Sequence, residues 1–219
     1  FEGWEDEEGI TRDPQSLLHS VRSYADKMHL FCQAGQIKAP AKTHKLLSYL
    51  EDSVFEVNVP RTDGRGGVFH PKVWVLRYLP DPACEEEDEE ERPVHYRLLC
   101  LSRNLTFDSA WDTCLALDGK LINRRNAFAK NHPVGEFLEA LPDLAVSQGS
   151  EPLEKARKKI LEMGREVRRV DFEPPTGIDS CHFHAMGIDG RYPWPFPEDG
   201  YRSCIVSPFL SNDLLINDF

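Results

Sequence analysis

Two short segments carry the residue types best suited to chemistry, His70 with Lys72 and Ser102 with Asn104. His70 and Lys72 stand two apart in an apolar run, 68–79, that predicts a strand. Side chains two residues apart on a strand point to the same face, so an imidazole and an ammonium should emerge side by side. Neither group belongs in an apolar core without a partner, which favours a functional role.

A second predicted strand, 94–101, would bring the other segment to the same place. If it pairs back on the first strand, Ser102 and Asn104 lie beside His70 and Lys72. A histidine can attack phosphorus covalently, and a lysine and an asparagine can hold the oxygens on which negative charge develops. This set predicts phosphoryl transfer with no metal or other cofactor. The alternative is a surface-exposed strand end with ordinary polar residues.

These motifs resemble those of the phospholipase D superfamily. Its HxK motif is matched by residues 70–72 (His-Pro-Lys), and its GSxN-like turn by residues 101–104 (Leu-Ser-Arg-Asn), followed by Leu-Thr as in many bacterial nuclease-like members. The resemblance implies an α/β fold with a mixed β-sheet flanked by helices, which forms a phospholipase D-like half-module. It also implies a histidine nucleophile, a phosphohistidine intermediate and no metal. The expected enzyme is a nuclease or DNA-end-processing phosphodiesterase, of that branch or of the tyrosyl-DNA phosphodiesterase-like branch.

The chain departs from the family pattern at three positions. The aspartate five residues beyond the lysine is replaced by Arg77, although the tyrosyl-DNA phosphodiesterase branch also lacks this acid. The glycine of the turn is replaced by Leu101. The acid that often orients the histidine would fall on Leu115, which leaves Asp112 as the nearest substitute for that role.

An active site in this family needs two such motifs, and the sequence shows one. Residues 182–184 (His-Phe-His) lack the lysine. The chain starts with Phe1 rather than Met, which indicates a processed chain or a piece of a longer one. We therefore expect the second HxK motif to come from a second copy, in a homodimer, or from sequence beyond Phe219. The alternative is a non-catalytic module that binds or scaffolds.

Several other residues could contact a nucleic-acid substrate. Arg61, Arg65 and Arg103 flank the proposed site and could grip a phosphate backbone, with solvated arginines as the alternative. Trp111 could stack on bases, although packing in the core is the expectation for it.

The cysteines and the remaining histidines predict no metal site. Cys181, His182, His184 and Cys204 could be zinc ligands, but their spacing matches no familiar finger, so core or edge positions are the better interpretation. The six cysteines are scattered without a CxxC pair, and we expect reduced thiols.

Charge and hydropathy narrow the classes of partner. The net charge of −11 argues against a general nucleic-acid coat protein, but the acidic run 85–91 contributes seven of those charges and leaves −4 elsewhere (−11 + 7). A nucleic-acid substrate therefore remains the expectation. No apolar stretch approaches the roughly 20 residues of a membrane helix, so we expect no membrane partner and a cytoplasmic protein.

Three segments are predicted: an acidic lead-in, 1–13; the phospholipase D-like domain, 14–145, with both motifs and an acidic loop at 80–93; and 146–219, a linker helix with the start of a second β-rich half. The expected helices are 14–25, one beginning near 42, 133–141 and 152–168. The expected strands are 28–32, 53–59, 68–79, 94–101, 111–117, 170–172, 181–188 and 203–210.

Overall fold

The computed structural model describes residues 14–37, 48–59, 67–80, 93–103 and 111–188, and the structural statements below concern these residues. The lead-in 1–13, most of the acidic loop, the helix expected near 42 and the strand expected at 203–210 lie outside them. The elements are α2 (Pro14–Tyr24), η1 (Ala25–Lys27), β1 (Leu30–Gln33), η2 (Glu51–Ser53), β2 (Val54–Val57), β3 (Val73–Tyr78), β4 (His95–Leu101), β5 (Cys114–Leu121), η4 (Ala129–Asn131), α4 (His132–Leu144), α5 (Glu151–Val167) and β6 (Val170–Phe172).

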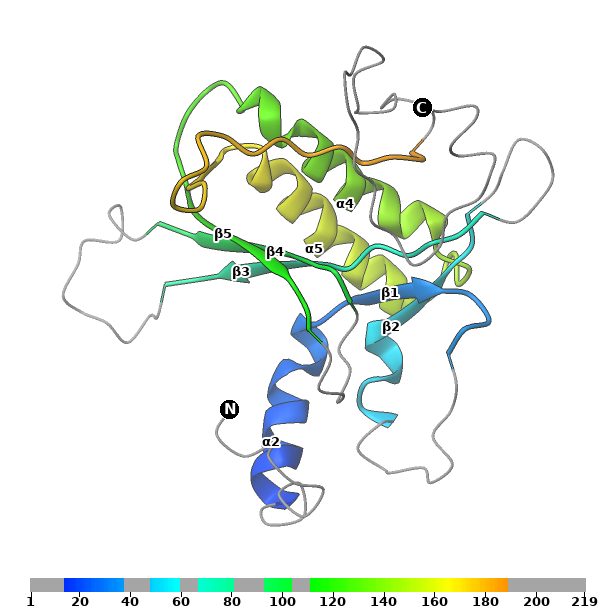
Figure 1. The fold of residues 1–219 in the computed structure, drawn as a ribbon. Coiled ribbons are helices and arrows are strands. Elements are labelled where there is room, and N and C mark those ends of the chain that lie inside the picture. The colour runs from blue at the N-terminus through cyan, green and yellow to red at the C-terminus, as the bar shows by residue number, and fades with distance from the viewer. Residues whose placement is uncertain (1–13, 38–47, 60–66, 81–92, 104–110, 189–219) are drawn as a thin grey trace.

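The strands form two sheets. Four antiparallel strands in the order β3-β4-β5-β6 make the larger sheet, and β1 pairs with β2 in parallel. Helices α4 and α5 lie together across one face of the larger sheet (Figure 1). The α/β class is therefore confirmed. In the described part of the chain, parallel and antiparallel pairs belong to separate sheets rather than to the one mixed sheet expected from the sequence.

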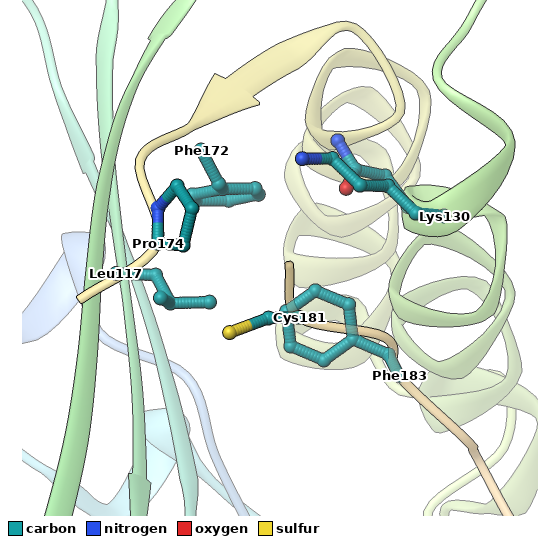
Figure 2. A pocket seen from close by; sticks show the side chains of 7 residues that line it. Leu117, Lys130, Phe172, Pro174, Cys181 and Phe183 are labelled. Carbon is teal, nitrogen blue, oxygen red and sulfur yellow. The ribbon is translucent and has the colours of Figure 1, made fainter. Parts of the chain in front are cut away.

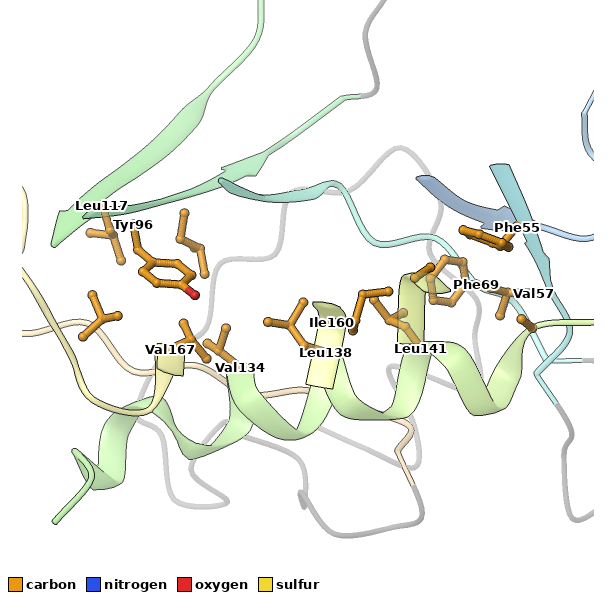
Figure 3. Close-up of a cluster of buried hydrophobic side chains, with 14 of the residues drawn as sticks. Phe55, Val57, Phe69, Tyr96, Leu117, Val134, Leu138, Leu141, Ile160 and Val167 are labelled. Atoms are coloured by element: carbon orange, nitrogen blue, oxygen red, sulfur yellow. The ribbon is translucent and has the colours of Figure 1, made fainter. Parts of the chain in front are cut away.

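The core lies between the larger sheet and the two helices. Along β4, Tyr96 and Leu98 are 1% and 2% exposed, and Leu117 of β5 stands directly opposite Leu98. These side chains face the helices, where Ile160 and Val167 of α5 are also buried (Figure 3). Side chains alternate along a strand, so Leu99, the residue after Leu98, points to the other face of the sheet.

The segment after residue 145 belongs to this same core. β6 pairs with β5, and α5 packs against α4. Ala145 is buried and forms a β-bridge with Val57, so the connection from α4 to α5 begins inside this core. The sequence-based boundary between residues 145 and 146 therefore runs between two helices that share one core.

Most predicted elements between residues 14 and 172 are present, with shifted ends. The strand predicted over 68–79 begins only at Val73, so His70 and Lys72 precede β3 instead of lying within it. Before β3 the chain bonds to the smaller sheet instead, where the Phe69 N–H donates to the Gln33 side chain. β5 continues to Leu121 because Gly119 gives β6 room: a Cβ there would lie 2.6 Å from the carbonyl oxygen of Asp171. Residues 181–188 do not form the expected strand.

A charged cluster fixes β3 and β4 to α5. Arg77 donates to both carboxylate oxygens of Glu166, at 2.8 and 2.9 Å, and to Glu162 at 3.0 Å. The Tyr96 hydroxyl, opposite Arg77 in the sheet, also donates to Glu166, at 2.5 Å. Burial opposes ionisation of Glu166, but the hydrogen bonds from Arg77 and Tyr96 outweigh it and lower the pKa of Glu166. Arg77 therefore has a structural role, at the position where the phospholipase D pattern has an aspartate.

The variant Glu166→Gln is expected to lower the free energy of unfolding by about 2–3 kcal/mol, because Arg77 keeps its charge and loses its carboxylate partner. Urea denaturation measures this loss. The matched control is Glu162→Gln, which removes an exposed contact of the same arginine and should change the free energy by less than about 0.5 kcal/mol.

The same pair predicts a pH dependence. Because the pKa of Glu166 is lower in the folded chain than its unfolded value of about 4.3, the unfolded state binds more protons near and below that pH. The contribution of Glu166 is therefore complete above the unfolded pKa and is lost as the pH falls through the folded pKa. The stability difference between wild type and Glu166→Gln should shrink below about pH 4. A difference that grows on acidification would contradict this assignment.

Candidate functional site

The segment that carries His70 and Lys72 is held at both ends. Phe69 is buried in the core, and its N–H donates to the side-chain oxygen of Gln33, at the end of β1, over 2.5 Å. The Lys72 carbonyl accepts from the N–H of Leu101 at 2.9 Å, which continues the β3–β4 ladder by one pair. The backbone on either side of His70 is thereby fixed relative to both sheets.

His70 and Lys72 lie side by side, as their spacing predicts. Lys72 Nζ is 3.0 Å from both ring nitrogens of His70. The ammonium therefore lies against the imidazole ring, equally close to both nitrogens, and the tautomer of His70 decides which nitrogen can accept. His70 is exposed and Lys72 half-buried, so the pair is open to solvent on one side. The arrangement places a fixed cation against a potential nucleophile.

The turn after β4 lies next to this pair. Leu101, bonded to Lys72, is followed by Ser102, whose N–H donates to the Thr113 carbonyl at 3.0 Å. The Ser102 hydroxyl donates to the Asp112 carboxylate, and the Thr113 N–H donates to both side chains, at 3.0 and 2.9 Å. Asp112 and Ser102 therefore fix the start of the turn that leads to Asn104.

These contacts bear on the roles predicted for the two residues. The hydrogen bonds of Asp112 in the described region go to Ser102 and Thr113, and none goes to His70. The role of Asp112 supported by geometry is to brace the turn rather than to orient the imidazole. The hydroxyl of Ser102 is engaged in the same brace.

The structure describes only some of the remaining residues predicted for the site. Asn104, Arg61 and Arg65 lie outside the described residues, so their positions stay predictions. Arg103 is half-buried at the end of the described turn. Trp111, for which we expected core packing, is 99% exposed, so that expectation is wrong.

Gln33, which fixes the backbone next to His70, was not predicted to belong to the site. It is a polar residue at the very end of a short apolar strand, and that position was the only signal available. Its partner is the backbone N–H of Phe69, 36 residues away. Neither the distance nor the partner can be read from a local pattern.

Of the residues considered as zinc ligands, Cys181 is half-buried, His182 and His184 are exposed, and Cys204 lies outside the described residues. Cys181 and Phe183 border a cavity of about 10 Å³ together with Leu117, Phe172 and Pro174 (Figure 2), which is room for about one water molecule. Within the described ranges, no three His, Cys, Asp or Glu side chains gather as a metal site would need. The described cysteines, Cys32, Cys100, Cys114 and Cys181, are all free thiols.

Comparison with known proteins gives no relative. No family model, no curated protein and no solved structure matches the chain. Among the described helices, none has the length and apolar content needed to cross a membrane. The function of the site therefore has to be argued from its geometry.

The variant Gln33→Leu is expected to destabilise the chain by about 1–3 kcal/mol, because the Phe69 N–H would be left without an acceptor. The variant Gln33→Glu keeps a side-chain oxygen at the same position and should remain closer to wild type. Urea unfolding of the two variants measures the difference. Equal stabilities would mean that the hydrogen bond between Gln33 and Phe69 does not hold the segment.

Proposed function

We propose that this chain carries one half of a metal-independent phosphodiesterase site of the phospholipase D type, in a nuclease or DNA-end-processing enzyme. His70 is the nucleophile, Lys72 and Asn104 hold phosphoryl oxygens, and Ser102 with Asp112 braces the turn. The main support is the 3.0 Å separation between Lys72 Nζ and the ring nitrogens of His70, on a backbone bonded to the start of that turn.

The geometry supports the following first step. A diester draws the Lys72 ammonium onto its non-bridging oxygens, which frees the lone pair of His70. That nitrogen attacks phosphorus, the bond from phosphorus to the leaving oxygen breaks, and a phosphohistidine forms. Lys72, fixed next to His70, stabilises the charge on the oxygens as the bond forms. Water then displaces the histidine and releases a phosphomonoester.

A poor leaving group needs a proton, and His70 alone cannot both attack phosphorus and supply it. A second HxK motif would provide that acid, either from another copy of the chain in a two-fold dimer or from a longer chain. Nucleic acid is the proposed substrate, with Arg103, Arg61 and Arg65 available to contact phosphates.

One observation favours a second candidate, a non-catalytic phospholipase D-like module for binding or scaffolding. Arg77 occupies the position where the family pattern has an aspartate, and it is engaged by Glu166 and Glu162 in a structural cluster. In this chain, residue 77 therefore has a structural role. The two candidates differ in whether His70 forms a covalent bond to phosphorus.

The decisive substrate is bis(p-nitrophenyl) phosphate, because p-nitrophenolate leaves without needing a proton and a half-site can therefore complete the first step. We expect the chain to release up to one p-nitrophenolate per His70, with a phosphohistidine detectable by mass spectrometry. His70→Asn should reduce the rate by several orders of magnitude.

The control is His95→Asn, which removes an exposed histidine at the far end of β4 and should leave the release unchanged. Equal release by folded His70→Asn would remove His70 from the role of nucleophile. A folded wild-type chain that releases nothing would favour the non-catalytic module.

The same release should persist in excess EDTA, because Lys72 and Asn104 hold the oxygens in place of a metal ion. Stopped-flow absorbance of p-nitrophenolate, with and without EDTA, measures this. Loss of the release in EDTA, with recovery on adding zinc or magnesium, would instead indicate a metal-dependent reaction.

A further inference from the structure

Two tryptophans beside the candidate site are open to solvent. Trp111 is 99% exposed and Trp74 is 42% exposed, although tryptophan is a residue that proteins bury extensively on average. We propose that both rings are stacking platforms for the bases of a single-stranded nucleic acid whose phosphate lies at Lys72. This inference rests on the proposed function and specifies its substrate class.

Strand register places Trp74 on the same face of the sheet as Lys72. Trp74 lies opposite Leu99, and the Lys72 carbonyl accepts from Leu101. Because Leu98 faces the helices, Leu99 and Leu101 face the other way, and the residues directly across from them share that face. Two residues along a strand span about 6.6–6.8 Å, so the side chains of Lys72 and Trp74 leave the backbone about that far apart.

Trp111 lies on the segment that braces the turn after β4. It immediately precedes Asp112, whose carboxylate accepts from the Ser102 hydroxyl. Asp112, Thr113 and Ser102 are themselves exposed, so the ring of Trp111 stands among polar groups. An aromatic ring fully in water, on the segment that braces the turn after β4, can stack on a flat ligand whose anion lies at Lys72.

A nucleotide has both of these features, a flat base and a phosphate. Base–aromatic stacking contributes about 1–3 kcal/mol per base and accepts any base. In a duplex both faces of each base are already stacked, so two protein rings require unpaired bases. A protein interface would instead centre on a broad apolar area depleted of charge. The residues that follow Trp111 are the polar Asp112 and Thr113, and Trp74, which lies opposite Leu99, has the cationic Lys72 two residues away.

The overall charge agrees with binding by stacking. The net charge is −11, or −4 without the acidic run, so the chain lacks the positive electrostatic potential on which binding through phosphates depends. If Lys72 and Arg103 make two phosphate contacts, log K should fall with log salt with a slope of only about −1.4. A steep slope would mean that cations, not rings, supply the affinity.

The test measures fluorescence anisotropy of labelled oligothymidylate in the His70→Asn background, which removes the proposed cleavage. Trp111→Ala and Trp74→Ala should each weaken binding roughly 5- to 150-fold, and Trp111→Phe should restore most of the affinity. An abasic strand with the same phosphates should bind the parent weakly and lose little in either variant. A duplex of the same length should also bind weakly.

The control is Tyr78→Ala, which removes a comparably exposed aromatic, at 48%, from the far end of β3 and should leave binding unchanged. The proposal is overturned if the abasic strand binds as well as oligothymidylate, or if neither alanine variant weakens binding. It is also overturned if Trp111→Ala acts only by converting a sedimenting dimer to a monomer, which would make this surface an interface between copies of the chain.

The release of p-nitrophenolate separates this inference from the proposed function. Suppose that chains with His70 release p-nitrophenolate, while neither tryptophan variant changes the affinity for oligothymidylate. The catalytic proposal is then supported and the stacking proposal is contradicted. If no release occurs and binding still depends on the rings, the stacking proposal stands on a binding module.

Discussion

The register of β3 against β4 is the constraint on which the site depends. His70 and Lys72 precede β3, and the turn with Ser102 follows β4, so antiparallel pairing brings the two motifs to one end of the sheet. A slip by one residue would turn every side chain of β3 to the opposite face. Arg77 opposes this slip, because it reaches Glu166 only from the face that packs on α5.

The candidate site and the structural cluster use different faces of one strand. The open face and N-terminal end of β3 carry Lys72 and Trp74, while the face toward α5 carries Arg77. Burial of Arg77 and Glu166 is tolerated because each oxygen of that carboxylate has a donor. The candidate site thus lies at one end of the larger sheet, and the hydrogen bond from Phe69 to Gln33 links its backbone to the smaller sheet.

Local patterns predicted most of the elements between residues 14 and 172, because alternation and helical periodicity are properties of neighbouring residues. The predicted ends differ from the observed ones: β3 begins at Val73 instead of residue 68, and Gly119 lets β5 extend to Leu121 where β6 approaches. The adjacency of His70 and Lys72 was predictable for the same reason, since two residues apart in extended backbone remain on one side. The brace between Ser102 and Asp112 was not, because it depends on how two strand ends meet.

The sequence by itself determined the α/β class, the two motifs and the closeness of His70 to Lys72, since these follow from residue types and short spacings. Tertiary structure decided what each lone residue does. Gln33 bonds a backbone N–H 36 residues away, and Arg77 finds its carboxylate 89 residues away. Trp111 looked like a core residue and lies in solvent. Burial and long-range partners depend on packing between distant segments, which no local pattern encodes.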